Sequence, residues 1–429
     1  MQKLPFDGLQ FALLQTLLVA AVVPGQPRIS QVACLAAVVP ISYHLITKTS
    51  TGDAAGDLGL GSAILTQILV ALDLVFFTDP NTLKNLEKPE ESTRITEQPF
   101  SRRLRWALDL YTNVRGIGWA HEAPLLPERP EKTMTRRKFL MDRLVIVASC
   151  GVLELALTVM NASNPRMTAT DDLASYAWYW KVLGVSCFGI AGASRIEAMY
   201  CMLSMAVVGL GFSSPHRWPR AFGSPLDAWS VQRFWRRVWH QNLRKSALGC
   251  TEFILAPFSV FDRTKVPNQP QLSTAIKLAR LYLAFTITGI VHIGGEYMLL
   301  GKMGWGSFTF FALQAVGISI EKAVSACYRV LLERTPQNDH PTANVHGRGS
   351  GGHPAQENGT GKPNDVGSMR KGSEKREKKI EMWIRCIGYI WVILWFSWSA
   401  SYMVDPIIST GMFVHPWLDL RRRGEWWFV

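Results

Sequence analysis

A histidine lies within an apolar segment of the chain, where its imidazole could serve as a catalytic base. His292 follows eleven uncharged residues, Leu281 to Val291, and helical spacing places Glu296 on the same face. An ionisable group at membrane depth is costly, so it normally faces the protein interior or a watery cavity. A neutral imidazole in such a place can take the proton of a hydroxyl group. The alternative is a structural histidine that hydrogen-bonds a neighbouring helix.

A second set of chemically capable side chains gathers between residues 224 and 245, in the stretch SPLDAWSVQRFWRRVWHQNLRK. On a helix, Trp235 and Trp239 would share one face, and Arg236 and His240 another. Arginine binds phosphate in a bidentate manner, so this stretch could dock a phosphate-bearing cosubstrate. The residues that we predict for that role are Arg236, Arg237, Trp239, Arg244 and Lys245. The competing interpretation is an amphipathic helix at the membrane interface, attracted to anionic lipid.

The composition indicates which scaffold has to position these residues. The 429 residues are 48% hydrophobic and 18% charged, with a formal net charge of +13. The mean hydropathy is +0.08. A chain this apolar is not intrinsically disordered, and seven cysteines are too few for a disulfide-stapled scaffold. Charge-free windows near the length of a membrane-spanning helix alternate with polar stretches, which is typical of a polytopic membrane protein.

These windows predict an all-α integral membrane protein of about eight or nine transmembrane helices, forming a single domain over residues 1–429. The segment 247–261 is short and contains Pro257, so we expect it to be re-entrant or interfacial. The expected spans are 9–25, 29–47, 59–78, 143–161, 173–192, 196–213, 275–300, 305–333 and 381–404.

Three polar stretches separate the spans, at 79–142, 214–246 and 334–380. Their lysines and arginines predict that all three lie in the cytosol. The third is rich in Gly, Asn, Pro and His, which predicts a flexible loop in which His346 and His353 are solvated. No metal-ligand spacing stands out in the chain.

The cytosolic assignment creates a conflict of parity. Two cytosolic flanks require an even number of crossings between them, yet three expected spans fall between the first two polar stretches. Lys181 lies at the centre of the expected span 173–192, and a central lysine is costly in lipid. We therefore expect that 173–192 does not cross the membrane fully, or that 173–213 forms a broken hairpin.

Two of these motifs together resemble the membrane-bound O-acyltransferases. They are the FWRRVWHQNLR block and the later apolar GIVHIGGEY helix, and in particular they look like the wax-synthase-like branch, which includes fungal enzymes that acylate secondary metabolites. The block ALDLYTNVRGIGW at 107–119 is similar to a stretch of that fungal subgroup. The resemblance covers most of the chain, through the order of the spans, the basic block and the histidine-bearing helix.

The resemblance implies a fold that encloses a chamber, reached by acyl-CoA from the cytosol and by the acceptor from the bilayer. It maps the family's intramembrane histidine onto His292. The polar residue of the basic block maps onto His240, with Asn242 two positions later as the alternative. We expect His292 to act as general base, and His240 or Asn242 to orient the acyl group or stabilise the oxyanion.

The expected reaction is transfer of an acyl group, and on the subgroup resemblance an acetyl group, from acyl-CoA to a hydroxyl of a hydrophobic acceptor such as a terpenoid. No permanently bound cofactor and no nucleic acid is expected, and the protein is expected to be a multi-pass protein of the endoplasmic reticulum. Two alternatives stay open: a long-chain wax ester or neutral-lipid synthase, and a multi-pass transporter, which would also explain spans, glycines and buried ionisable groups. A further alternative is a scaffolding protein in which His292 is structural.

Overall fold

The computed structural model describes residues 3–87, 89, 94–169, 173–265, 274–334 and 364–414. Within these residues the chain is helical apart from connecting segments and one parallel pair of two-residue strands, β1 (Leu4–Pro5) and β2 (Thr49–Ser50). The all-α prediction is therefore confirmed. The α-helices that carry the argument are α1 (Gly8–Val22), α2 (Arg28–Lys48), α3 (Ala54–Leu72), α5 (Phe100–Thr112), α6 (Arg136–Ser163), α7 (Trp178–Gly209), α8 (Val231–Arg233), α9 (Arg244–Lys265), α10 (Thr274–Leu300), α11 (Gly306–Arg334), α12 (Asn364–Ser399) and α13 (Ser401–Ile408).

Seven helices in the described part of the chain are long and apolar enough to cross a membrane. These spans, together with the shorter apolar α1 of 15 residues, account for all the expected spans except in one region, 173–213. The seven are Arg28–Lys48, Ala54–Phe77, Arg136–Ser163, Trp178–Gly209, Thr274–Leu300, Gly306–Leu331 and Glu381–Ser399.

The region 173–213 differs from the prediction. The expected spans 173–192 and 196–213 are parts of one helix, α7, which runs unbroken for 32 residues. Lys181 lies in the first turn of α7 rather than at the centre of a span, so it does not prevent crossing. Both predictions for this region, a partial crossing and a broken hairpin, are wrong. Helices α6 and α7 pack against each other and are two candidate spans, an even number, which agrees with the prediction that both flanking polar stretches lie in the cytosol.

The stretch 224–245 is not the continuous amphipathic helix that the spacing suggested. It contains the short α8, then a π-helical turn, η6 (Phe234–Val238), and then an extended residue, Trp239. Helix α9 begins only at Arg244 and contains the segment 247–261. It is not among the seven candidate spans of the described residues, and a re-entrant or interfacial position for it stays a prediction.

Backbone contacts hold α10, the helix that carries His292, against α3. A Cβ atom on Gly295 would lie 2.0 Å from the carbonyl oxygen of Leu58, and one on Gly294 would lie 2.7 Å from that of Gly61. Only glycine permits so close an approach of two helices, so the glycines after His292 serve packing. This contact fixes the depth at which His292 lies.

Glu296 serves the fold rather than the cavity described below. Its carboxylate is buried and accepts hydrogen bonds from the backbone N–H groups of Gly306 and Ser307, at 3.1 and 2.9 Å. Those N–H groups open α11 and have no partner within the helix, so the carboxylate caps α11 and ties it to α10.

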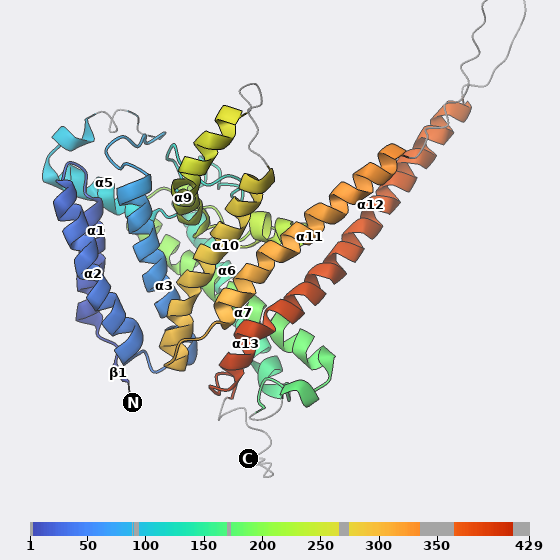
Figure 1. Ribbon diagram of the computed structural model, residues 1–429, viewed down its shortest axis with the longest axis horizontal. Coiled ribbons are helices and arrows are strands. Elements are labelled where there is room, and N and C mark those ends of the chain that lie inside the picture. Colours follow the sequence, from blue (N-terminus) through green and yellow to red (C-terminus); the bar gives the residue numbers. More distant parts are fainter. Residues whose placement is uncertain are drawn as a thin grey trace, which may run out of the picture.

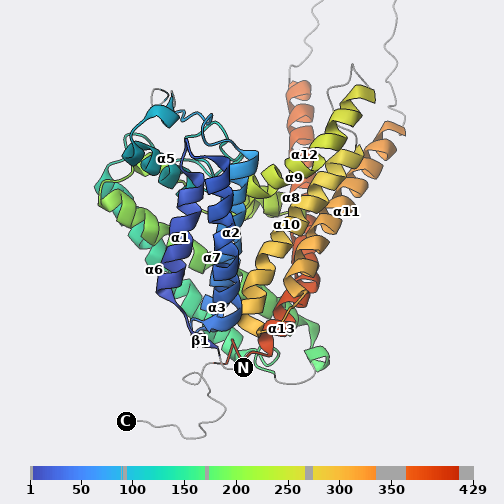
Figure 2. The same cartoon turned by 60° about the vertical axis from the view of Figure 1, so that its left-hand side comes forward.

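The ribbon places the basic parts of the chain at one end of the bundle. Figure 1 shows α5, α9 and the far ends of α11 and α12 at the top, with β1 and α13 at the bottom, and Figure 2 shows the same division with α8 also near the top. Helices α11 and α12 run side by side, and Trp391 of α12 donates to Glu321 of α11 at 2.9 Å.

The predicted flexible loop 334–380 is described only in part. Residues 335–363, which include His346 and His353, lie outside the described residues. From Asn364 onward the chain belongs to α12, so the prediction of a flexible loop up to residue 380 is wrong for that portion.

Candidate active site

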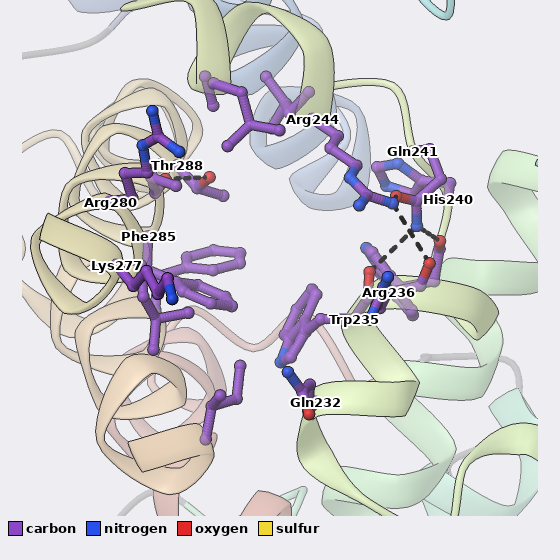
Figure 3. A pocket seen from close by; sticks show the side chains of 18 of the residues that line it. Gln232, Trp235, Arg236, His240, Gln241, Arg244, Lys277, Arg280, Phe285 and Thr288 are labelled. Atoms are coloured by element: carbon purple, nitrogen blue, oxygen red, sulfur yellow. Dashed lines mark hydrogen bonds between the residues drawn. The ribbon is translucent and has the colours of Figure 1, made fainter. Parts of the chain in front are cut away.

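A cavity of about 330 Å³ lies between the 232–248 segment, α10 and α11. Figure 3 shows Lys277, Arg280, Phe285 and Thr288 of α10 along one wall, facing Trp235 and the 236–244 segment across the space. His292 and His240 both line this cavity, so the structure brings the two predicted histidines together.

One stripe of α10 lines the cavity from its charged end to His292. The lining residues of this helix recur at helical spacing and therefore share a face. At about 1.5 Å of rise per residue, Lys277 and Arg280 stand about 22 and 18 Å along the axis from His292. The stripe is cationic at the start of α10, then apolar, and ends at the imidazole; its members are Lys277, Arg280, Leu281, Ala284, Phe285, Thr288 and His292.

The backbone of α10 selects the tautomer of His292. The Nδ1 atom lies 2.8 Å from the carbonyl oxygen of Thr288, one turn earlier. A carbonyl oxygen can only accept, so Nδ1 carries the proton and donates it there. The Nε2 atom is left with its lone pair, which is the form that a general base requires. The ring of Phe311 packs against the imidazole, with centroids 4.4 Å apart.

His240 follows the π-helical turn and is held by its neighbours. Gln241 donates from Nε2 to the carbonyl oxygen of Trp235 at 3.0 Å and also to that of Trp239, which closes the turn. The Nδ1 atom of His240 is buried and has no hydrogen-bond partner within the described part of the chain. Burial, together with the nearby His292 and Arg115, lowers the pKa of His240 to about 3. The imidazole is therefore neutral at physiological pH and can donate one hydrogen bond.

The lining of the cavity is strongly cationic. Its lining residues include five basic side chains and no Asp or Glu. Arg280 is paired with Glu252 outside the lining, whereas Lys277 and Lys322 have no carboxylate partner among the described residues. Such a surface attracts an anionic ligand with several negative charges. The five are Arg236, Arg244, Lys277, Arg280 and Lys322.

Aromatic rings close the cavity beside His292. Trp235 packs against Phe285 and Phe311, with ring centroids 5.7 and 5.6 Å apart. Phe310 and Phe396 pack behind Trp235, at 6.2 and 6.0 Å. Rings in contact leave little room between them, so the space next to the imidazole is narrow.

The predicted phosphate-binding residues divide into two groups. Arg236, Trp239 and Arg244 line the cavity. Arg237 is not among the lining residues and lies 4.0 Å from Asp227. Lys245 forms a buried ion pair with Asp73 at 2.9 Å, which ties α9 to the end of α3. Both of these stay predictions for phosphate binding, but the structure gives each another partner.

Asn242 and the cations of α10 and α11 show where sequence reasoning fell short. Asn242 is not among the residues that line the cavity, whereas its neighbour Gln241 is. Lys277, Arg280 and Lys322 line it and were not predicted. Their signal was present in the sequence, because Lys277 and Arg280 fall on the helical stripe that ends at His292. Within the described residues no group of three or more possible metal ligands is found.

Known proteins resemble the chain over the region that builds this cavity. The family model described as "Membrane bound O-acyl transferase family" matches residues 218–313, which contain both the basic block and the His292 helix. The acetyltransferase ataH of Aspergillus terreus is 31% identical over 337 residues, covering 73% of this chain and 91% of the relative. The chain belongs to the membrane-bound O-acyltransferase family.

Two further relatives extend the comparison. The acetyltransferase eriL of Hericium erinaceus is 25% identical over 418 residues, 96% of this chain and 93% of the relative. The O-mevalon transferase macI of Penicillium terrestre is 31% identical over 288 residues, 61% of this chain and 63% of the relative. No solved structure matches. The acyltransferase is thus an integral membrane enzyme, and its family implies an acyl-CoA cosubstrate.

Proposed function

We propose that this enzyme transfers an acetyl group from acetyl-CoA to a hydroxyl of a hydrophobic acceptor such as a terpenoid alcohol. The observation that carries the proposal is the free Nε2 of His292 at one end of a cavity that has five basic side chains and no acid. A base for a hydroxyl proton and a cationic surface for a phosphate-rich donor are what the reaction requires.

In the proposed step the hydroxyl oxygen attacks the thioester carbonyl carbon while His292 Nε2 takes the hydroxyl proton. The negative charge collects on the carbonyl oxygen, and the neutral His240 donates a hydrogen bond to it. The carbon–sulfur bond then breaks, and the leaving thiolate takes the proton back from His292. The products are the ester and free CoA, and His292 ends in its starting form.

The length of the donor fits the stripe of α10. About thirteen bonds join the sulfur of CoA to its pyrophosphate, and at the ~3.5 Å that three bonds of extended chain span they reach about 15 Å. With the sulfur near His292, the phosphates would come close to Arg280, about 18 Å away along the helix, with Lys277 and Lys322 beyond them. We place Arg236 and Arg244 in the same phosphate-binding set, with Trp239 beside them.

The short donor is supported by two observations. Relatives at 25 and 31% identity are named acetyltransferases. The aromatic rings of Trp235, Phe285 and Phe311 narrow the cavity beside His292, which favours an acyl group of few carbons. The fungal relatives support an acceptor from secondary metabolism. We assign the enzyme to the endoplasmic reticulum with its basic end in the cytosol, where acyl-CoA is available.

The test is a donor and acceptor assay in microsomes from a host that lacks neutral-lipid synthesis. Acetyl-CoA and farnesol serve as probes, and release of free CoA is measured at matched protein levels. His292→Ala should lower the rate by about 10²–10⁴-fold, the range of general base catalysis. The control is Glu154→Gln, which alters an α6–α7 ion pair away from the cavity and should retain the wild-type rate. Wild-type activity in His292→Ala would refute the general-base role.

A further inference from the structure

A buried charge network lies beside the cavity and is not used by the proposed reaction. Glu197, within the membrane-spanning helix α7, is 4% exposed, and Arg115 is 3% exposed. Arg115 belongs to the block at 107–119, to which the proposed function gives no role. Burial of a charged group is costly unless it is paired and hydrogen-bonded, so the partners of Glu197 and Arg115 show where the two side chains act.

Both side chains converge on the segment Pro219–Gly223. The Glu197 carboxylate accepts from the backbone N–H of Ala221 at 3.1 Å and pairs with the Arg220 side chain. Arg115 donates to the carbonyl oxygens of Arg220 at 2.8 Å and of Pro219 at 3.4 Å. Three consecutive residues of this short segment are thus tied to α7 and to the 107–119 block.

Arg115 is itself fixed by α7. Its guanidinium lies over the ring of Tyr200 at 4.8 Å and donates to the Tyr200 hydroxyl. Tyr200 follows Glu197 by three residues, so both groups project from one face of the same helix. The network is therefore anchored in the membrane-spanning part of the fold rather than in a loop.

The same segment reaches His240. The rings of Phe222 and His240 stand edge to face with centroids 5.6 Å apart and an interplanar angle of 84°. Phe222 meets Trp239 in the same way at 5.3 Å. The N–H of Gly223 donates to the carbonyl oxygen of Val238 at 2.9 Å, which joins the segment to the end of the π-helical turn. A Cβ on Gly223 would lie 1.9 Å from the carbonyl oxygen of Arg237, so only glycine fits there.

We propose that Glu197 and Arg115 are positioning residues for His240, acting through Phe222. The chain of contacts runs from α7 to the segment Pro219–Gly223, and from Phe222 to the imidazole. The inference rests on the proposed function only in that His240 takes part in the transfer. Neither Glu197 nor Arg115 lines the cavity, so neither is expected to touch the donor.

The experiment compares Glu197→Gln with Glu154→Gln in the microsomal assay, with acetyl-CoA and farnesol as probes. Glu154 is a matched control because it forms an ion pair with Arg195 across α6 and α7 and its carboxylate is bonded to α7 rather than to the segment 219–223. A displaced catalytic group costs up to about a hundredfold in rate, so Glu197→Gln should lower kcat at least about tenfold. Its KM for acetyl-CoA should stay within twofold, because the cations of α10 and α11 are untouched. Glu154→Gln should leave kcat unchanged.

A merely structural role is excluded by repeating Glu197→Gln in a His240→Ala background. If Glu197 acts through His240, the second substitution lowers kcat no further, since coupled groups are not additive. Equal losses in both backgrounds, or an unchanged kcat in Glu197→Gln, would overturn the inference alone. Wild-type kcat in His240→Ala would instead overturn the role of His240 and the inference with it. If the Glu197→Gln protein does not accumulate, Phe222→Leu replaces it, because this variant removes the ring contact with His240 without altering a charge. A lowered kcat that falls no further in the His240→Ala background supports the inference, and an unchanged kcat overturns it.

Discussion

The cationic wall of the cavity makes a quantitative prediction about how the donor binds. Lys277 on α10 and Lys322 on α11 line the cavity, are exposed, and have no carboxylate partner in the described part of the chain. An exposed ion pair contributes about 0.2–1 kcal/mol, so two such contacts to CoA phosphates contribute about 0.4–2 kcal/mol. At about 1.4 kcal/mol per factor of ten, the variant Lys277→Ala/Lys322→Ala should show a KM for acetyl-CoA raised about 2- to 30-fold.

The assay separates phosphate binding from general damage by changing the donor. S-acetylpantetheine carries the same thioester and arm but no phosphates. Its KM should be the same in the wild-type enzyme and in the double variant, and kcat with acetyl-CoA should be unchanged. The rise in KM should shrink at high salt, because exposed charges are screened.

The matched control is Lys302→Ala. Lys302 is an equally exposed lysine just beyond the opposite end of α10, so it changes the net charge by the same sign at a place remote from the cavity's cations. It should leave both KM values unaltered. If the double variant raised the KM of S-acetylpantetheine as much as that of acetyl-CoA, or raised neither, the assignment of these lysines to the phosphates would be refuted.

Three further predictions follow from the cavity and its supports. Phe311→Ala removes the ring that packs on His292, so butanoyl- and hexanoyl-CoA should gain relative to acetyl-CoA in a competition assay; an unchanged donor profile would contradict the narrowing by aromatic rings. Folding lowers the pKa of His240 from its ordinary ~6.5 to about 3, so as the pH drops the imidazole takes up a proton in the unfolded chain before it does so in the folded one. The free energy of unfolding should therefore fall by about 1 kcal/mol between about pH 7.5 and 5.5. Thermal unfolding in detergent should show a weaker pH dependence in His240→Gln, and equal slopes would contradict it. Gly295→Ala places a methyl group 2.0 Å from the carbonyl oxygen of Leu58, so it should lower the unfolding temperature and the activity together. The control is Gly301→Ala, which has open space around it but a φ of +68° and should cost only about 1 kcal/mol of local strain.

The sequence was enough to predict the structure where a single physical requirement governed a long segment. Membrane spans need long charge-free windows, and most of those windows became helices at the expected places. The intramembrane His292 and the basic block stand out for the same reason, since charge in or beside lipid requires an explanation. Both His292 and His240 then proved to line one cavity.

Prediction failed where two requirements competed. Lys181 looks like a barrier to crossing, but a helix longer than the bilayer can place a lysine in its first turn, at the polar end. The spacing of Trp235, Trp239 and His240 suggests a regular helix, but a π-helical turn and an extended residue intervene. The break depends on Gln241, whose side chain closes the turn by hydrogen bonds to two backbone carbonyl groups. Helical periodicity reports only which residues share a face, so it could not reveal such a contact.

The cations of α10 escaped prediction for a reason that bears on other membrane enzymes. Lys277 and Arg280 resemble the polar end of a span, a role that any lysine or arginine can fill. Their phase on the helix carries more information than their presence, because residues 277, 280, 284, 288 and 292 recur at helical spacing and so share one face. A charge on the same face as a buried histidine, about one pantetheine arm away, is positioned to hold the far end of a ligand whose near end meets that histidine. A charge at the same depth on another face of α10 meets lipid, water or one of the helices α3, α9 and α11 that pack against α10. Tracing the face of the intramembrane histidine back to the membrane surface therefore identifies, from sequence position, the cations that share a face with the histidine and are candidates for ligand binding.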